Sequence, residues 1–326
     1  MLEYEFMQHA FAAASIVAVA ASLVGYFLVI RGQTFAGHAL SHVGFAGATG
    51  AVLLGVPPLA GLLLATVAAG AGMGLLGERF QQRDVAIGIV LAASLGLGLL
   101  FLHFFTAYAS QATALLFGNV LGVDTATLVA LLVLGLVTVA ALAVISRPLL
   151  FATLQPELAE AKGVSLRLVS VLFLIIVALA TAASVQIVGI LLVFTLMVAP
   201  AAAAQRLTIR LWPGLALSVV LALVEAWAGL TLAYYTDWPT SFWITALGAV
   251  IYLCAHLGPR HGATGQGAHH GHAHHDHSHH DHGHHDYAHS HAAIAGLQAG
   301  PQAREGLSQR VRDQPAEGAT TVELKP

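Results

Sequence analysis

Long apolar stretches alternate with short polar connections along the first four-fifths of the chain. A membrane-spanning helix needs about 20 mainly apolar residues, and nine segments come close to that length. The pattern predicts an all-α polytopic membrane protein with about eight or nine transmembrane helices. The predicted spans are residues 9–30, 36–55, 58–76, 85–105, 125–146, 168–185, 189–204, 212–235 and 241–257.

Composition narrows the class of protein further. The 326 residues are 57% hydrophobic and 9% charged, with a mean hydropathy of +0.79, whereas soluble domains carry about 25% charged residues. No GxxxxGK phosphate loop occurs, so the chain is not expected to bind ATP, and no HExxH motif indicates a membrane metalloprotease. We expect a protein of the lipid bilayer that is not an enzyme and does not bind nucleic acid.

Positive charge predicts how the spans are oriented. Lysine and arginine accumulate in cytoplasmic loops, and the nine basic residues up to residue 260 all fall in alternate connections between the predicted spans or just after the last span. The N-terminus is therefore expected outside and the C-terminus in the cytoplasm. The nine residues are Arg31, Arg79, Arg83, Arg147, Lys162, Arg167, Arg206, Arg210 and Arg260.

Two histidines interrupt the second apolar segment. His38 and His42 are four residues apart, so a helix places both imidazoles on one face. Ionisable side chains within a span usually line a wet path or pair with another polar group. The pair is therefore the leading candidate for a site that passes on a transported transition metal. Glu225, in the predicted eighth span, is a weaker candidate for a third ligand or a gate residue, because a hydrogen bond between helices would also explain it.

The longest internal connection, residues 147–167, contains signals for a short helix. Pro156 suits a first helical position, Glu157 favours the positive end of the helix dipole, and Gly163 suits the position after the last turn. Either a cytoplasmic partner binds this helix or the helix only rests on the membrane surface.

The tail, residues 259–326, follows the predicted transmembrane part, residues 1–258, and contains a histidine-rich tract over 269–291. Thirteen of these 23 residues are histidine, interleaved with small and acidic residues. Such a composition favours a disordered cytoplasmic segment with several weak metal sites that could buffer or sense the ion. The candidate ligands are His269, His270, His272, His274, His275, His277, His279, His280, His282, His284 and His285.

Five patches in order resemble the ABC-3 permeases, the membrane subunits of bacterial ABC importers for zinc and manganese. They are RGQTFAGHALSHVGFAG from Arg31, LFGNVLGV from Leu116, QPELAEAKG from Gln155, SVQIVGILLVFTLMVAPAAAA from Ser184, and GLTLAYYTDWPTS from Gly229. The resemblance spans about residues 5–257.

This resemblance implies ABC importer permease architecture, a homodimer, a cytoplasmic ATP-binding subunit and an extracytoplasmic metal-binding protein. The helix around Pro156, Glu157, Leu158, Ala159 and Gly163 is similar to the family's coupling helix, although Gln155 stands where aspartate is usual. In the family, the first position of the polar pair is often aspartate, whereas here it is His38. Nitrogen in place of oxygen favours zinc over manganese, so Zn²⁺ is the expected substrate, with manganese as the alternative and no permanently bound cofactor.

A stand-alone proton-coupled metal carrier is the competing function. A histidine-rich cytoplasmic segment would suit it equally well. Such a carrier needs intramembrane carboxylates for both metal and proton, and Glu225 is the only acid plainly inside a predicted span. Co-purification of an ATPase distinguishes the two functions.

Overall fold

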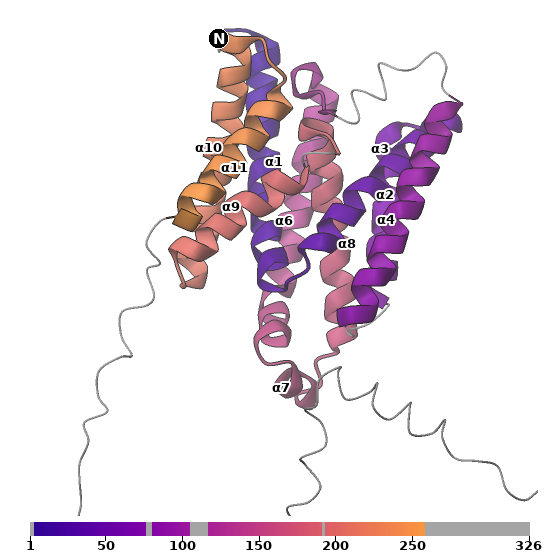
Figure 1. Cartoon of the computed structure of the whole chain (residues 1–326), viewed down its shortest axis with the longest axis vertical. Helices are drawn as coiled ribbons and strands as arrows, with labels where there is room; N and C mark the ends of the chain where they lie inside the picture. The colour runs from indigo at the N-terminus through magenta and orange to yellow at the C-terminus, as the bar shows by residue number, and fades with distance from the viewer. Residues whose placement is uncertain (1–2, 76–79, 105–116, 191–192, 258–326) are drawn as a thin grey trace, which may run out of the picture. The chain divides into compact units, whose positions relative to one another are not determined.

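The computed structural model describes residues 3–75, 80–104, 117–190 and 193–257. The chain divides into two units, Met1–Gly267 and Ala268–Pro326; the histidine-rich tract lies outside the described residues. Figure 1 shows an all-helical first unit. Its long helices are α1 (Glu5–Ile30), α2 (Thr34–Leu53), α3 (Pro58–Leu75), α4 (Phe80–His103), α6 (Thr125–Leu154), α8 (Leu166–Val188), α9 (Val193–Leu207), α10 (Leu211–Thr236) and α11 (Thr240–Leu257), and its short ones are η1 (Val120–Gly122) and α7 (Pro156–Ala161).

These nine long helices coincide with the nine predicted spans. Within the described residues, six of them are long and apolar enough to cross a membrane: α1, α3, α6, α8, α10 and α11. Shorter apolar helices occupy Ile87–His103 and Val193–Leu207. The 20 residues of α2 include both histidines and four glycines, which lowers its hydropathy below that of its neighbours. The protein is a multi-pass membrane protein, as predicted.

Helix α1 is surrounded by other long helices. It packs against α6, α8, α9 and α10, and α11 packs on α9 and α10. Helix α2 packs chiefly on α3 and α4, and α3 joins this group to α8. The helix that carries both histidines is therefore held mainly by α3 and α4, with lighter contacts to α8 and α9.

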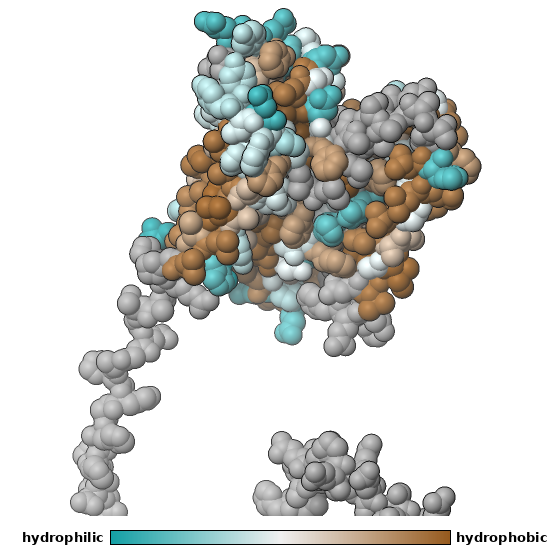
Figure 2. Space-filling model, turned by 45° about the horizontal axis from the view of Figure 1, so that its top comes forward, coloured by the Kyte–Doolittle hydropathy of each residue, from teal (hydrophilic) through white to brown (hydrophobic). Residues whose placement is uncertain are grey.

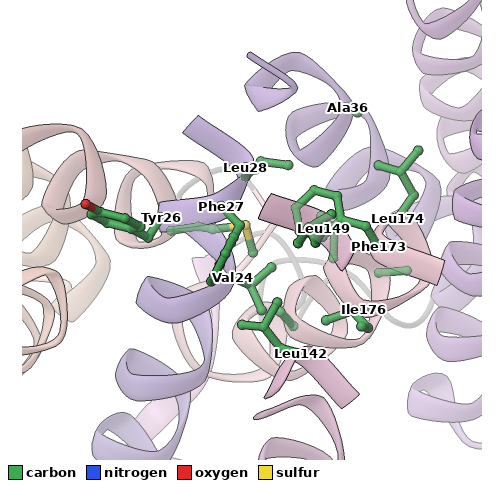
Figure 3. Close-up of a cluster of buried hydrophobic side chains, with 14 of the residues drawn as sticks. Val24, Tyr26, Phe27, Leu28, Ala36, Leu142, Leu149, Phe173, Leu174 and Ile176 are labelled. Carbon is green, nitrogen blue, oxygen red and sulfur yellow. The ribbon is translucent and has the colours of Figure 1, made fainter. Parts of the chain in front are cut away.

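The main hydrophobic core lies where α1, α6 and α8 meet (Figure 3). Leu28 of α1, Leu149 of α6 and Phe173 of α8 are each 0% exposed. Arg31, just after α1, places its guanidinium carbon 5.5 Å from the centroid of the Phe173 ring and donates a 2.9 Å hydrogen bond to the Thr153 hydroxyl. The end of α1 is thus fixed to the ends of α6 and α8 at one side of the bundle.

Glycine permits close approach between α3 and α8. A Cβ on Gly70 would lie 2.7 Å from the carbonyl oxygen of Leu174, and a Cβ on Gly74 would lie 2.5 Å from the Cα of Val171. Membrane helices associate closely through small residues at such positions. The two glycines therefore attach the α2–α3–α4 group to the centre of the fold.

Several predicted boundaries were off by a few residues, most of all at the end of α6 and the start of α4. Helix α6 runs to Leu154 and so contains Arg147 and Pro148, which were expected in the connection 147–167. The helix persists past the proline because Leu149 and Ala152 bury their side chains in the core. Helix α4 begins at Phe80, so Arg83 also lies within a helix and not in a connection.

The short helix in the connection was predicted correctly. Pro156 occupies the first turn of α7, and Gly163 follows with a φ of +81°. Gln155 supplies no side-chain hydrogen bond to the N-terminus of α7, in line with its weaker capping ability than aspartate.

Candidate metal path

The two histidines of α2 meet one another. Their ring centroids are 4.9 Å apart and the ring planes are inclined by 85°. His42 is buried, at 9% exposure, and His38 is partly buried. The Nδ1 atom of His38 is buried and has no hydrogen-bond partner within the described residues. The predicted pair is thus assembled, and one of its ring nitrogens is unpaired among the residues that the structure describes.

The turn between α1 and α2 determines where the pair lies. Gly32 adopts a φ of +62°, which glycine tolerates readily. The backbone N–H of Gln33 donates to the carbonyl of Leu28, which closes the turn, and α2 begins at Thr34. One turn into the helix, the Ser41 hydroxyl donates a 2.7 Å hydrogen bond to the His38 carbonyl. The pair therefore lies within the first three turns of α2.

Helix α9 closes one side of the pair. The ring of Phe194 stands edge-on to that of His38, at a centroid distance of 5.5 Å and an angle of 75°. Phe194 is the second residue of α9, which begins shortly after Gly189, a glycine with a φ of +84°. An aromatic wall therefore covers His38 on the side of α9.

Glu225 lies on α10 and does not join the histidines. Its side chain is 0% exposed, and neither carboxylate oxygen has a hydrogen-bond partner within the described residues. A Cβ on Gly248 of α11 would lie 2.7 Å from Glu225 Oε1 and 2.8 Å from Thr195 Cγ2. Thr195 thus approaches the Glu225 region, whereas its neighbour Phe194 faces His38.

The described residues contain no group of three or more His, Cys, Asp or Glu side chains able to hold a metal ion. Two imidazoles give an incomplete shell for a transition metal. A site of this kind can hold an ion only with water or with groups from elsewhere, which suits brief retention of a passing ion better than permanent binding.

A cavity of about 540 Å³ lies at the end of the molecule where α1 begins. Sequence reasoning missed it, although two of the five family-like patches, around Asn119 and Trp238, contribute to it. The Ser241 hydroxyl donates to the Phe117 carbonyl, and Gly118, with a φ of +78°, lies against the backbone of Ile187. The lining includes Phe6, Asn119, Leu230, Tyr234, Asp237 and Trp238.

Asp124 stands at this same end and caps α6. Its carboxylate accepts a 2.9 Å hydrogen bond from the Thr127 N–H. Hydrogen bonding from Thr127 holds the pKa of Asp124 below its ordinary value.

The coupling-helix candidate lies at the other end. Ala159 of α7 is 0% exposed, whereas Leu158 is 45% exposed, and the Lys162 ammonium lies 5.6 Å from the centroid of the Phe151 ring. Pro156, Glu157 and Gly163 are also exposed. The helix is anchored through Ala159 and presents its other side chains outward.

The surface agrees with a membrane environment. Figure 2 shows hydrophobic side chains spread over the flanks of the helices, with hydrophilic side chains gathered toward the upper end of that view. Exposed apolar residues on α6 include Val133, Leu136 and Val144, at 55%, 62% and 79%. In lipid such side chains need no cover.

Comparison with known proteins places the chain in a family. Residues 3–258 match the model of the ABC 3 transport family. The chain is 29% identical over 256 residues to the manganese transport system membrane protein MntC of Halalkalibacterium halodurans, covering 78% of this chain and 85% of that one. It is 31% identical over 261 residues to a Haemophilus influenzae protein named "Probable iron transport system membrane protein", covering 78% and 94%.

A solved structure shares the fold. PsaBC from Streptococcus pneumoniae, in complex with Fab, superposes with a TM-score of 0.71 at 24% identity and covers 79% of this chain and 94% of that one. This agreement confirms the predicted ABC importer permease architecture. The chain therefore belongs to the ABC 3 transport family, as the membrane permease subunit of an ABC importer that does not itself carry the ATPase site.

Proposed function

We propose that this permease passes a divalent transition metal across the membrane and that His38 and His42 hold the ion on its way. The observation that carries the proposal is the pair itself: two imidazoles 4.9 Å apart on a membrane helix, with His38 Nδ1 buried and unpartnered within the described residues. Neutral imidazole is a common transition-metal ligand, and an apolar span rarely contains such groups without a role.

Two observations favour different metals. The relatives named for manganese include MntC of H. halodurans and MntC of Listeria monocytogenes, at 29% and 26% identity, and these names support manganese better than zinc. The donor set favours zinc, because two nitrogens replace the harder oxygen ligands that manganese prefers. Zinc and manganese are therefore the two ions to compare directly.

The importer has further partners in this proposal. A cytoplasmic ATPase binds the exposed face of α7, an extracytoplasmic metal-binding protein delivers the ion, and two permease copies form a homodimer. The N-terminus lies outside and the tail in the cytoplasm. Arg31 and Lys162 support this orientation. Arg31 donates to Thr153 near the end of α6 that leads into α7, and Lys162, which follows α7, lies over Phe151 of α6. Both basic side chains therefore lie at the end of the bundle that carries α7, and basic residues accumulate in cytoplasmic loops. In the tail, the histidines of residues 269–291 buffer or sense the ion.

Uptake of zinc and of manganese into proteoliposomes tests the proposal. The vesicles contain the permease with its ATPase and binding protein, with ATP present or absent. His38→Ala and His42→Ala should each reduce ATP-dependent uptake below about a tenth of the wild-type rate, since half of the protein's ligand set is lost. His256→Ala, at the far end of α11, is the matched control and should transport normally.

Each alternative has its own outcome in this experiment. Normal uptake by both histidine variants would remove the pair from the path. Uptake that ignores ATP and follows a proton gradient would favour the proton-coupled carrier. Within the described residues Glu225 is the one buried acid, so such a carrier would depend on it.

A further inference from the structure

Thr181 of α8 departs from the behaviour of the other buried threonines in the described helices. The hydroxyls of Thr49, Thr66 and Thr138 each donate to the carbonyl four residues earlier, at 2.8, 2.8 and 2.7 Å. Thr181 is 0% exposed, and its Oγ1 has no hydrogen-bond partner within the described residues. Buried hydroxyls are normally paired, because an unpaired one costs about 1–3 kcal/mol.

The position of Thr181 follows from its neighbours on α8. Val177 precedes it by one turn and lies beside Gly37 of α2, where an added Cβ would be 3.9 Å from Val177 Cγ1. Val185 follows it by one turn and belongs to the same buried cluster as Phe45 of α2. Residues four apart share a helix face.

These neighbours occur in the same order along the two helices. On α2, the position midway between Gly37 and Phe45 is Ser41, and on α8 the position midway between Val177 and Val185 is Thr181. Ser41 lies between His38 and His42 in sequence and binds the His38 carbonyl. This register places Thr181 at the level of the histidine pair along the two helices, one turn after Val177, which lies beside α2.

Within the described residues, His38 Nδ1 on α2 and Thr181 Oγ1 on α8 are both buried without a hydrogen-bond partner. One ligand could interact with both atoms. A hydrated metal ion would do so, because the imidazole nitrogen binds the ion and the threonine hydroxyl accepts a hydrogen bond from a water molecule on the ion. Two imidazoles leave coordination positions that water fills.

We propose that Thr181 is a positioning residue of the metal path, and that its hydroxyl holds a water molecule of the ion bound at His38 and His42. This inference depends on the proposed function. It assigns the third protein contact to a neutral oxygen on α8 and not to a carboxylate, which suits an ion that must be released.

Equilibrium dialysis of zinc alone and of manganese alone against the permease–ATPase complex in nanodiscs tests the inference. Thr181→Val keeps the side-chain shape and removes the hydroxyl, and should weaken ion retention about tenfold, the effect of one hydrogen bond to a charged group. Thr181→Ser restores the hydroxyl and should retain ions within about twofold of wild type, which a purely packing role would not predict. Thr138→Val, on α6, is the matched control and should leave retention unchanged.

The outcomes separate this inference from the proposed function. If His38→Ala loses the ion while Thr181→Val retains it as wild type does, the role of Thr181 is wrong and the histidine path stands. If the wild-type complex and His38→Ala retain equally little, the proposed function fails first. Should Thr181→Val not assemble, Thr181→Ala is compared with Thr181→Ser, and equal retention by these two overturns the inference.

Discussion

The ring of Phe194 on α9 meets the imidazole of His38 on α2 edge-on, with 5.5 Å between the ring centroids. This contact joins two helices that otherwise touch only lightly. Because α9 begins beside the pair, a small displacement of its first turn would uncover His38. If the pair holds the ion as proposed, movement of α9 at this contact would open or close access to it.

Phe194→Leu tests this relationship. Leucine keeps an apolar side chain of similar size but removes the aromatic edge contact, which is worth about 0.5–1.5 kcal/mol. We expect zinc and manganese to dissociate from the complex about three- to tenfold faster, with assembly unchanged. Stopped-flow release into a fluorescent chelator measures this rate. Phe242→Leu, in the exposed aromatic group at the start of α11, is the control, and equal rates for the two variants would contradict a covering role for Phe194.

His38→Asp tests what determines metal preference. An oxygen ligand replaces a nitrogen ligand at the first position of the pair, and harder oxygen ligands favour manganese. We expect the ratio of manganese to zinc uptake to rise roughly tenfold, a change of about 1.4 kcal/mol in relative binding. Competitive uptake of the two ions, each at the same free concentration, measures the ratio. An unchanged ratio would show that groups other than this ligand select the metal.

Gly70 and Gly72 lie on the same helix but in opposite environments. A Cβ on Gly70 would come within 2.7 Å of the Leu174 carbonyl oxygen, whereas a Cβ on Gly72 would meet nothing within 4 Å. Gly70→Ala should lower stability by about 1–3 kcal/mol through overpacking. Gly72→Ala should leave it unchanged or raise it by about 0.5–1 kcal/mol. Thermal unfolding in detergent measures both, and equal midpoints would contradict the close α3–α8 contact.

Leu158 tests the role of α7. It is 45% exposed beside the fully buried Ala159, so it can contact a partner without holding the fold together. Leu158→Asp should weaken binding of the ATPase about thirtyfold or more, since loss of a central interface residue costs about 2 kcal/mol or more, and co-purification should fall accordingly. Leu207→Asp, at the end of α9, is the control. Normal ATPase capture by Leu158→Asp would show that α7 only rests on the membrane.

Periodicity and terminal signals carried most of the fold prediction. Runs of apolar residues located every long helix, because a span in lipid must satisfy its own backbone hydrogen bonds. Pro156 and Gly163 located α7 for local reasons of backbone geometry. The end of α6 was missed because proline usually interrupts a helix. At Pro148 the helix continues, because Leu149 buries its side chain against helices that are distant in sequence.

The candidate site was also predicted only in part. The spacing of His38 and His42 predicted their shared face, since four residues make about one helical turn. Thr181 carried no sequence signal, because a threonine in an apolar span is ordinary. Its place beside the pair in our proposal comes from the packing of α8 and not from the sequence pattern. Glu225 could be recognised as buried, but its separation from the histidines depends on where α9 lies.

Glu225→Gln tests whether that separation matters. The amide has nearly the same shape as the carboxyl group, so the packing of α10 against Gly248 should persist. Because Glu225 is not grouped with the histidines, we expect the variant to retain zinc and manganese within about twofold of wild type, less than the roughly tenfold effect of 1.4 kcal/mol. Equilibrium dialysis measures retention, with His42→Ala as the variant that loses it. A loss as large as that of His42→Ala would make Glu225 a ligand after all, and would require α9 to move aside so that the carboxylate reaches the ion.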